Sequence, residues 1–165
     1  MSIELGVEPL SELAERIRSK RARVGVVGLG YVGLPLLIAA ETAGFETLGF
    51  DVDHEKIEQL RSGRSYIVDV SDSEVESAEF GEFSSDPAIL SRAHVIVICV
   101  PTPLTDRTPD LSMVRTAAEM VGRHLQPGRL VILESTTYPG TTEEVVRPIL
   151  EATSGLEAGQ DFALG

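Results

Sequence analysis

Short, continuous apolar runs divide the chain, and the segments between them carry apolar residues every three or four positions. The runs that predict strands are 23–27 (RVGVV), 45–53 (FETLGFDVD), 94–100 (HVIVICV) and 129–135 (RLVILES). Uniformly apolar strands are typical of a parallel sheet covered on both faces. The final FALG, 162–165, begins like one more strand.

The intervening segments predict helices over 9–20, 32–44, 54–63, 87–92, 110–124 and 141–151. Glycine ends two of them, at Gly44 and Gly63. Aspartates precede three others and are expected as N-caps: Asp53, Asp86 (followed by Pro87) and Asp110. Thr141 and Glu144 have the spacing of a capping box. Residues 64–83 have the weakest pattern, that of an acidic loop with one helical turn.

This alternation of strands and helices predicts a Rossmann-type α/β fold, a doubly wound parallel sheet with right-handed crossovers. We expect a single domain over 23–165, preceded by an N-terminal amphipathic helix within 1–22. Leu10, Leu13 and Ile17 form the apolar stripe of that helix.

Composition narrows the function classes. The 165 residues carry a net charge of −12, which disfavours binding to nucleic acid or to an anionic membrane surface. No apolar run approaches the ~20 residues of a membrane span, and the polar N-terminus is not a signal peptide, so we expect a cytoplasmic protein. The single cysteine, Cys99, and three scattered histidines predict neither a disulfide nor a metal site.

The stretch RVGVVGLGYVGLPLL places Gly28, Gly30 and Gly33 between the first strand and the next helix. In a dinucleotide-binding turn the first glycine allows the tight bend. The second lets the backbone approach a pyrophosphate, and the third lets helix and strand pack closely. The alternative is a plain strand–helix turn.

An acid follows at the end of the second strand. Asp51 lies where an adenosine ribose is bound, about 20 residues beyond the glycines, and its charge argues against NADP. The alternative is a strand-end turn residue. Asp53 is better explained as a helix cap than as a ligand, and Lys56 either reaches the adenosine side or is a solvated helix lysine.

Two more loops leave the carboxyl ends of strands. Residues 101–110 are expected to form a loop. Its start, VPTP at 100–103, has two prolines that stiffen it, so it is either a groove wall or a simple strand terminator. ESTTYPGTT, 134–142, offers hydroxyls and a carboxylate to a nicotinamide amide or a catalytic water, or serves local turns only. Cys99 is expected as a buried core thiol and His94 as structural.

Four ordered motifs, VGVVGLGYVGLPL, GFDVDHEKI, VIVICVPTPL and ILESTTYPGTTEEVV, resemble the UDP-glucose/GDP-mannose dehydrogenase family over roughly residues 10–165. The sequences of these motifs are most similar to the UDP-N-acetylglucosamine 6-dehydrogenase branch. The resemblance implies NAD-dependent oxidation of a sugar C6 alcohol to a carboxylate, through two hydride transfers and a cysteine thioester. It implies these cofactor-site residues: Gly28, Gly30, Tyr31, Val32, Gly33, Asp51, Lys56, Val100, Pro101, Thr102 and Thr136. Thr136 would also help to place the reactive water.

The resemblance also implies what this chain lacks. The family's catalytic cysteine, catalytic lysine, dimerisation helix and UDP-binding domain belong to segments beyond residue 165, and Cys99 does not match that cysteine. We therefore expect the cofactor domain of a longer enzyme, inactive alone. The full enzyme would bind a UDP-sugar and form a homodimer or larger assembly.

Several alternatives remain open at this level. The sugar is UDP-N-acetylglucosamine, UDP-N-acetylmannosamine or UDP-glucose, or the chain is a stand-alone NAD-binding module without catalysis. A 6-phosphogluconate or hydroxyacid dehydrogenase and a flavoprotein are disfavoured by the VPTP and ESTTYPGT loops.

Overall fold

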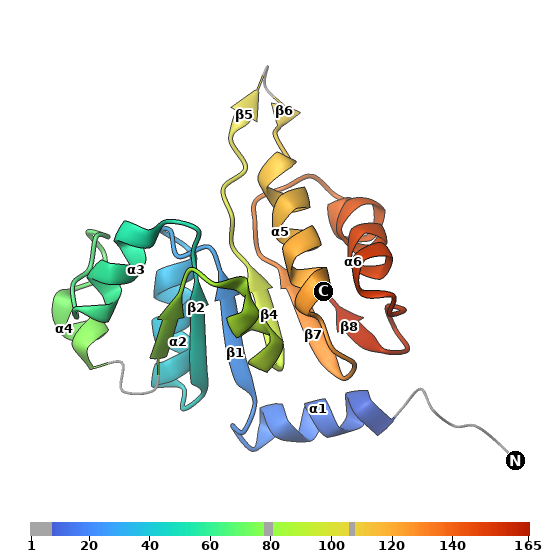
Figure 1. Ribbon diagram of the computed structural model, residues 1–165, viewed down its shortest axis with the longest axis horizontal. Helices are drawn as coiled ribbons and strands as arrows, with labels where there is room; N and C mark the ends of the chain where they lie inside the picture. Colours follow the sequence, from blue (N-terminus) through green and yellow to red (C-terminus); the bar gives the residue numbers. More distant parts are fainter. Residues whose placement is uncertain (1–7, 78–80, 106–107) are drawn as a thin grey trace, which may run out of the picture.

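Six parallel strands form one sheet in the order β3-β2-β1-β4-β7-β8 (Figure 1). The computed structural model describes residues 8–77, 81–105 and 108–165. The strands are β1 (Arg23–Val27), β2 (Glu46–Phe50), β3 (Gly81–Ser84), β4 (Val95–Ile98), β7 (Arg129–Leu133) and β8 (Phe162–Leu164). The strand order reverses between β1 and β4, which is where doubly wound folds bind their ligands. The predicted Rossmann-type fold is confirmed.

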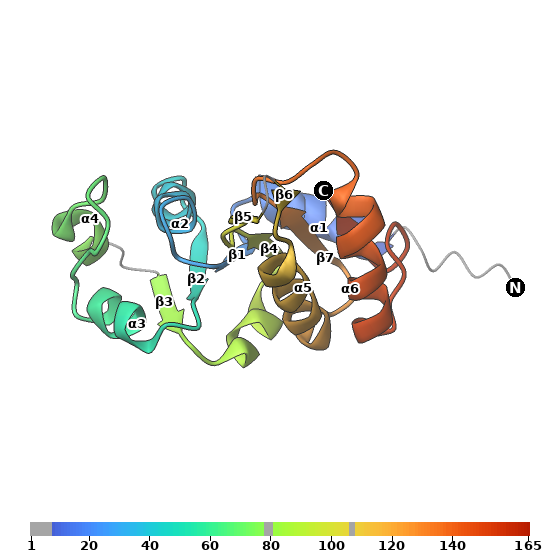
Figure 2. The same cartoon turned by 90° about the horizontal axis from the view of Figure 1, so that it is seen from above.

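Helices cover both faces of this sheet, and Figure 2 shows α2 and α5 on opposite sides of it. The α-helices are α1 (Glu8–Arg18), α2 (Gly33–Thr42), α3 (His54–Arg61), α4 (Asp72–Glu76), α5 (Ser112–His124) and α6 (Arg147–Ser154). One apolar core joins the sheet to α5, α6 and a 3₁₀ helix, Pro87–Arg92. A second core joins the sheet to α1, α2, α3 and α4.

Strand residues alternate between these two cores, as a doubly covered sheet requires. In β4, Ile96 and Ile98 face the first core, whereas Val95 and Val97 face the second. All four are less than 10% exposed, which explains why this stretch is apolar at every position.

Helix α1 lies across the amino ends of the strands, opposite the ligand-binding edge (Figure 1). Leu13 is buried and Ile17 packs partly against the second core, as the apolar stripe predicts. At this edge His94 Nδ1 accepts the Arg23 N–H at 3.0 Å, which confirms a structural histidine. Residues 1–7 of the expected N-terminal segment lie outside the described residues, and the division at residue 22 stays a prediction.

The acidic segment 64–83 contains more structure than expected. Helix α4 begins with a complete capping box between Ser71 and Glu74, and β3 pairs with β2 at the edge of the sheet. The strand was missed because Phe83 is its one buried residue, and one apolar position generates no alternation.

Two of the N-caps predicted from sequence form in the structure, and two do not. Asp53 and Asp86 cap their helices through their carboxylates, as predicted. Before α5 the N-cap position belongs to Leu111, and Asp110 instead accepts the Ser112 N–H at 2.8 Å. The expected Thr141–Glu144 capping box is wrong.

The Thr141 hydroxyl donates instead to the Tyr138 carbonyl at 2.8 Å, so it does not cap the helix. The helical segment begins with a π-helical stretch, Thr142–Val146, which continues directly into α6.

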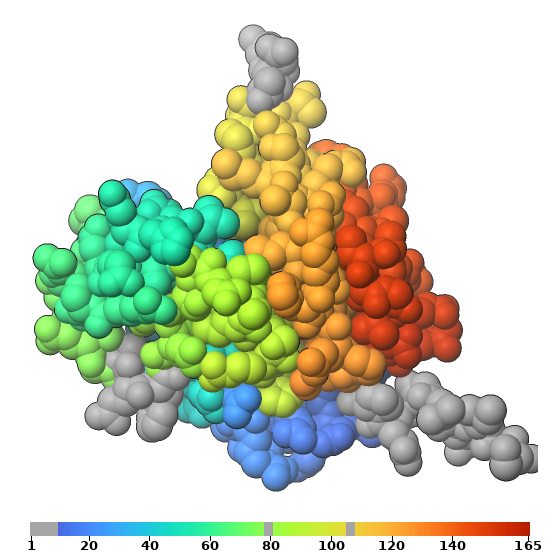
Figure 3. All heavy atoms as spheres, in the orientation of Figure 1, coloured from blue at the N-terminus to red at the C-terminus, as the bar shows by residue number. Residues whose placement is uncertain are grey.

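A small hairpin interrupts the expected loop over 101–110. Strands β5 (Leu104–Thr105) and β6 (Thr108–Pro109) pair antiparallel and project from the carboxyl edge, standing out from the surface in Figure 3. Residues 106 and 107 of that expected loop lie outside the described residues. In the part of the chain that is described, no helix is both long and apolar enough to cross a membrane.

Candidate functional site

A cleft of about 580 Å³ opens at the carboxyl edge, where the strand order reverses. It is lined by the glycine turn, the start of α3, the segment after α3 and the loops that follow β4 and β7. The expected site residues Gly30, Tyr31, Val32, Lys56, Val100, Pro101, Thr102 and Thr136 all line it. Gly28, Gly33 and Asp51 are not among the lining residues: the two glycines belong to the turn, and Asp51 accepts a hydrogen bond from it.

The glycine turn requires glycine for two different reasons. Gly28 has φ +91°, and a Cβ there would meet the Cys99 carbonyl oxygen at 2.8 Å. A Cβ on Gly33 would run into the Gly28 carbonyl oxygen, so this glycine allows helix α2 to pack on the strand. Both are constraints of the protein itself.

Gly30 differs, because a Cβ there would meet nothing within 4 Å. The protein's own packing therefore does not require glycine at this position. The space before it belongs to the cleft, and it is open to a ligand that approaches the backbone.

Asp51 is buried, with 8% of its side chain exposed, and it is bonded to the turn. Its Oδ2 accepts the Leu29 N–H at 2.9 Å and lies 3.6 Å from Lys56 Nζ, while Oδ1 accepts the Asp53 N–H at 3.0 Å. Two carboxylate oxygens offer about four acceptor positions, so room remains for a further donor. The acid at the end of β2 is thus held against the glycine turn.

The loops after β4 and β7 are joined to each other. The Thr102 hydroxyl donates to the Thr136 carbonyl oxygen at 2.5 Å, and the Ser135 hydroxyl donates to the Val100 carbonyl oxygen at 2.7 Å. These bonds make VPTP and EST one continuous wall of the cleft. The Thr136 side chain is exposed at its rim.

Residues 22–165 match the profile of the UDP-glucose/GDP-mannose dehydrogenase family, NAD binding domain. The chain belongs to this family. A UDP-N-acetyl-D-glucosamine 6-dehydrogenase of Pseudomonas aeruginosa is 41% identical over 148 residues, which is 88% of this chain and 35% of that protein. The chain therefore spans about a third of the length of the curated relatives that it matches.

Solved structures of the family show the same domain. A GDP-mannose dehydrogenase from Pseudomonas aeruginosa aligns with a TM-score of 0.82 at 30% identity, over 86% of this chain and 35% of its own. A UDP-D-ManNAc dehydrogenase from Pyrococcus horikoshii aligns with a TM-score of 0.81 at 36% identity, over the same shares. This NAD-binding domain of the UDP-sugar dehydrogenases thus has NAD as its cofactor.

The residues of the domain fit that cofactor. Among the described residues, the N–H groups of Gly30, Tyr31 and Val32 make no hydrogen bond to the backbone or to a side chain, and they stand at the start of α2. Unpaired N–H groups and the helix dipole attract phosphate oxygens locally, despite the net charge of −12. The Asp51 carboxylate, held against this turn, is an anionic acceptor that could bind hydroxyl groups.

Cys99 lines the floor of the same cleft but is not a nucleophile. Burial, followed by the negative charge of Glu134, raises the pKa of its thiol to about 11. A thiolate is the reactive form, so this cysteine is unreactive near neutral pH. The expected buried core thiol is confirmed, and no other cysteine exists in the chain.

Five lining residues were not among the expected cofactor-site residues: Tyr66, Ile67, Cys99, Glu134 and Ser135. Tyr66 and Ile67 belong to the segment whose pattern was weakest. Ser135 lies inside the recognised EST motif, so its place after β7 was a usable signal. Within the described residues, no group of three or more His, Cys, Asp or Glu side chains is arranged to hold a metal ion.

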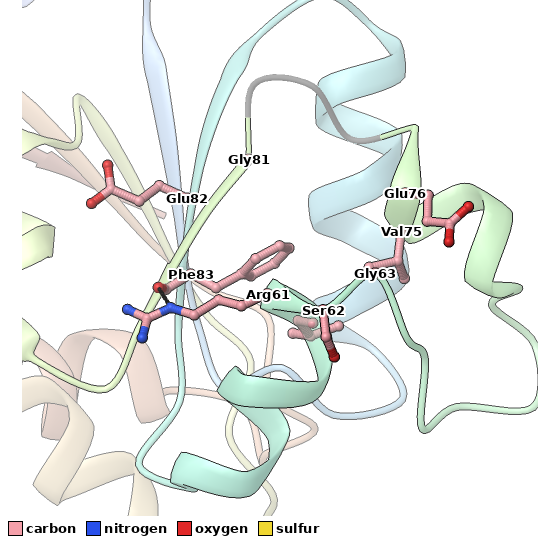
Figure 4. Close-up of a pocket in the computed structure, with 9 residues that line it drawn as sticks. Arg61, Ser62, Gly63, Val75, Glu76, Gly81, Glu82 and Phe83 are labelled. Carbon is pink, nitrogen blue, oxygen red and sulfur yellow. Dashed lines mark hydrogen bonds between the residues drawn. The ribbon is translucent and has the colours of Figure 1, made fainter.

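A second hollow of about 500 Å³ lies between the end of α3, α4 and β3 (Figure 4). Two of its three charged side chains, those of Arg61 and Glu82, already have partners. Arg61 donates to the Phe83 carbonyl oxygen at 3.1 Å and pairs with Glu58, while Glu82 pairs with Arg92. We therefore assign no chemistry to this hollow.

Proposed function

We propose that this chain is the cofactor domain of an enzyme that oxidises the C6 alcohol of UDP-N-acetylglucosamine to a carboxylate. The observation that carries the proposal is the buried Asp51 carboxylate, bonded to the glycine turn behind the open Gly30 position. The 41% identity to a UDP-N-acetyl-D-glucosamine 6-dehydrogenase supports this sugar. UDP-N-acetylmannosamine is the second candidate, because a UDP-N-acetyl-D-mannosamine dehydrogenase of Pyrococcus horikoshii is 38% identical.

The residues of the cleft take the following roles in this proposal. The N–H groups of the turn from Gly30 to Val32 bind the pyrophosphate, while Gly28 and Gly33 shape that turn. Asp51 accepts the hydroxyls of the adenosine ribose, with Lys56 beside it. Val100, Pro101 and Thr102 line the groove, and Thr136 orients the nicotinamide end.

NAD supplies the chemistry of hydride acceptance, and this chain supplies its binding and orientation. Asp51 selects NAD over NADP, because a carboxylate ~4 Å from a 2′-phosphate is repelled by about 4 kcal/mol at an effective dielectric of 20. The joined wall of VPTP and EST excludes water from one side of the groove. Thr136 offers its hydroxyl at the rim, where a sugar alcohol would approach.

The proposed reaction needs groups outside these 165 residues. Its covalent step requires a reactive thiolate, and the sole cysteine is buried with a raised pKa. The longer enzyme, which we place in the cytoplasm and expect as a homodimer or larger assembly, would supply the nucleophile and the UDP site.

The test uses the chain 1–165 as it stands. Calorimetry should detect binding of NAD and much weaker binding of NADP, and absorbance at 340 nm should show no reduction of NAD with any UDP-sugar. Equal affinities for the two cofactors would contradict the role of Asp51. Measurable turnover would contradict the need for a second domain.

A further inference from the structure

Tyr66 reaches the glycine turn from a distant part of the sequence. Its hydroxyl donates to the Leu29 carbonyl oxygen at 2.6 Å across 37 residues of chain. Tyr66 lies in the segment between α3 and α4, and it lines the same cleft as Gly30 and Tyr31. Nothing in the sequence motifs of the turn requires this contact.

The contact completes a two-sided anchor on Leu29. The Leu29 N–H donates to Asp51 Oδ2, the Leu29 carbonyl accepts from Tyr66, and the Leu29 side chain is fully buried. A trans peptide is planar, so the Leu29 carbonyl and the Gly30 N–H point in opposite directions from one rigid unit. The bond from Tyr66 therefore sets the direction of the Gly30 N–H.

The segment that carries Tyr66 is itself fixed. Ile67 and Val70 are buried in the second core, and the Ser65 N–H donates to Asp72 Oδ1 at 2.7 Å. The Tyr66 ring also lies 5.7 Å from Lys56 Nζ, which is the ammonium beside Asp51. The segment that carries the Tyr66 hydroxyl is therefore held by its own buried contacts, and it lies close to Lys56 and Asp51 as well as to the turn.

The hydroxyl remains a donor at all ordinary pH values. Burial first, then the negative charges of Asp51 and Asp53, raises the pKa of Tyr66 well above its usual value. An ionised phenolate would repel the Leu29 carbonyl, and the environment excludes that form.

We propose that Tyr66 is a positioning residue for the pyrophosphate of NAD, acting through the Leu29–Gly30 peptide. This inference rests on the binding of NAD in the cleft. Without the hydroxyl, the Leu29–Gly30 peptide keeps no hydrogen bond among the described residues and must be ordered when the phosphates bind, which weakens binding.

The test compares Tyr66→Phe, which removes one hydroxyl, with wild type. A net hydrogen bond is worth about 1 kcal/mol, so the Kd for NAD should rise roughly threefold to tenfold. Tyr138→Phe is the matched control, because the Tyr138 hydroxyl makes no hydrogen bond among the described residues, and its Kd should be unchanged.

A series of smaller ligands separates positioning from simple stabilisation. ADP-ribose, which contains the pyrophosphate, should lose the same factor as NAD, whereas adenosine should bind both proteins equally. A lower melting temperature with an unchanged Kd for NAD, or an equal loss for adenosine, would overturn the inference. If wild type itself fails to bind NAD, the proposed function fails as well.

Discussion

Replacing Asp51 by asparagine should reverse the cofactor preference of this domain. The substitution keeps the shape of the side chain but removes the charge that Lys56 faces at 3.6 Å. An amide has one oxygen, whereas Asp51 accepts backbone N–H groups at both of its oxygens. One of these N–H groups therefore loses its acceptor, at a cost of about 1–3 kcal/mol in the free energy of unfolding.

The effect on binding is larger for NADP than for NAD. A hydrogen bond to a charged acceptor contributes about 1.5–3 kcal/mol and a neutral one about 1 kcal/mol. Two ribose contacts would together lose about 2 kcal/mol, which raises the Kd for NAD roughly thirtyfold. NADP is relieved of about 4 kcal/mol of repulsion, because Asp51 is too buried for solvent to screen it strongly. The charge alone therefore accounts for about a thousandfold change in the ratio of the two Kd values.

The assay is calorimetric titration of wild type, Asp51→Asn and Asp53→Asn with each cofactor, alongside thermal unfolding of each protein. Asp53→Asn makes the same change of charge two residues away and keeps a good helix cap, so its cofactor ratio should match wild type. If Asp51→Asn retains the wild-type ratio while remaining folded, the carboxylate does not contact the ribose and the reasoning is wrong.

Other substitutions test the turn and the opposite edge of the sheet. Gly30→Ala should fold within about 1 kcal/mol of wild type yet bind NAD at least ~10-fold more weakly, because its Cβ fills space that only a ligand uses. Gly33→Ala should lose about 1–3 kcal/mol of unfolding free energy, since its Cβ meets a backbone carbonyl; equal stability of the two variants in urea would contradict both assignments. Burial, followed by neighbouring arginine charges, lowers the pKa of His94, so its neutral form stabilises the fold above pH ~6.5 and this contribution is lost as the pH falls further. Urea unfolding at pH 7.5 and 5.5 should therefore show a smaller difference for His94→Asn than for wild type or His124→Gln; identical differences would exclude His94.

The parts of the fold that the sequence predicts are those in which one physical requirement dominates. Strand β4 is buried on both faces, so every position is apolar and the strand is visible. Strand β3 buries only Phe83, so its hydrophobic pattern is weak. Its strand conformation depends instead on its pairing with β2. The Thr141 hydroxyl donates to the Tyr138 carbonyl and does not accept a helix N–H, and spacing in the sequence does not distinguish these two outcomes.

The residues of the site also differ in whether a local sequence pattern can predict them. Gly28, Gly33 and Asp51 follow from local geometry after β1 and β2, and spacing locates them. Tyr66 meets Leu29 only because the chain folds back over 37 residues, so no local motif contains that contact.

The cleft lies over the seam between two halves of the sheet. Gly30, Lys56 and Tyr66 come from the half built on β1, β2 and β3, whereas Val100 and Thr136 come from the half built on β4, β7 and β8. A dinucleotide bound there would contact both halves of the sheet at once. Its binding energy opposes their separation along β1 and β4, and saturation with NAD at 100 times Kd would stabilise the chain by about 2.7 kcal/mol. We therefore expect bound NAD to stabilise the structure of this domain.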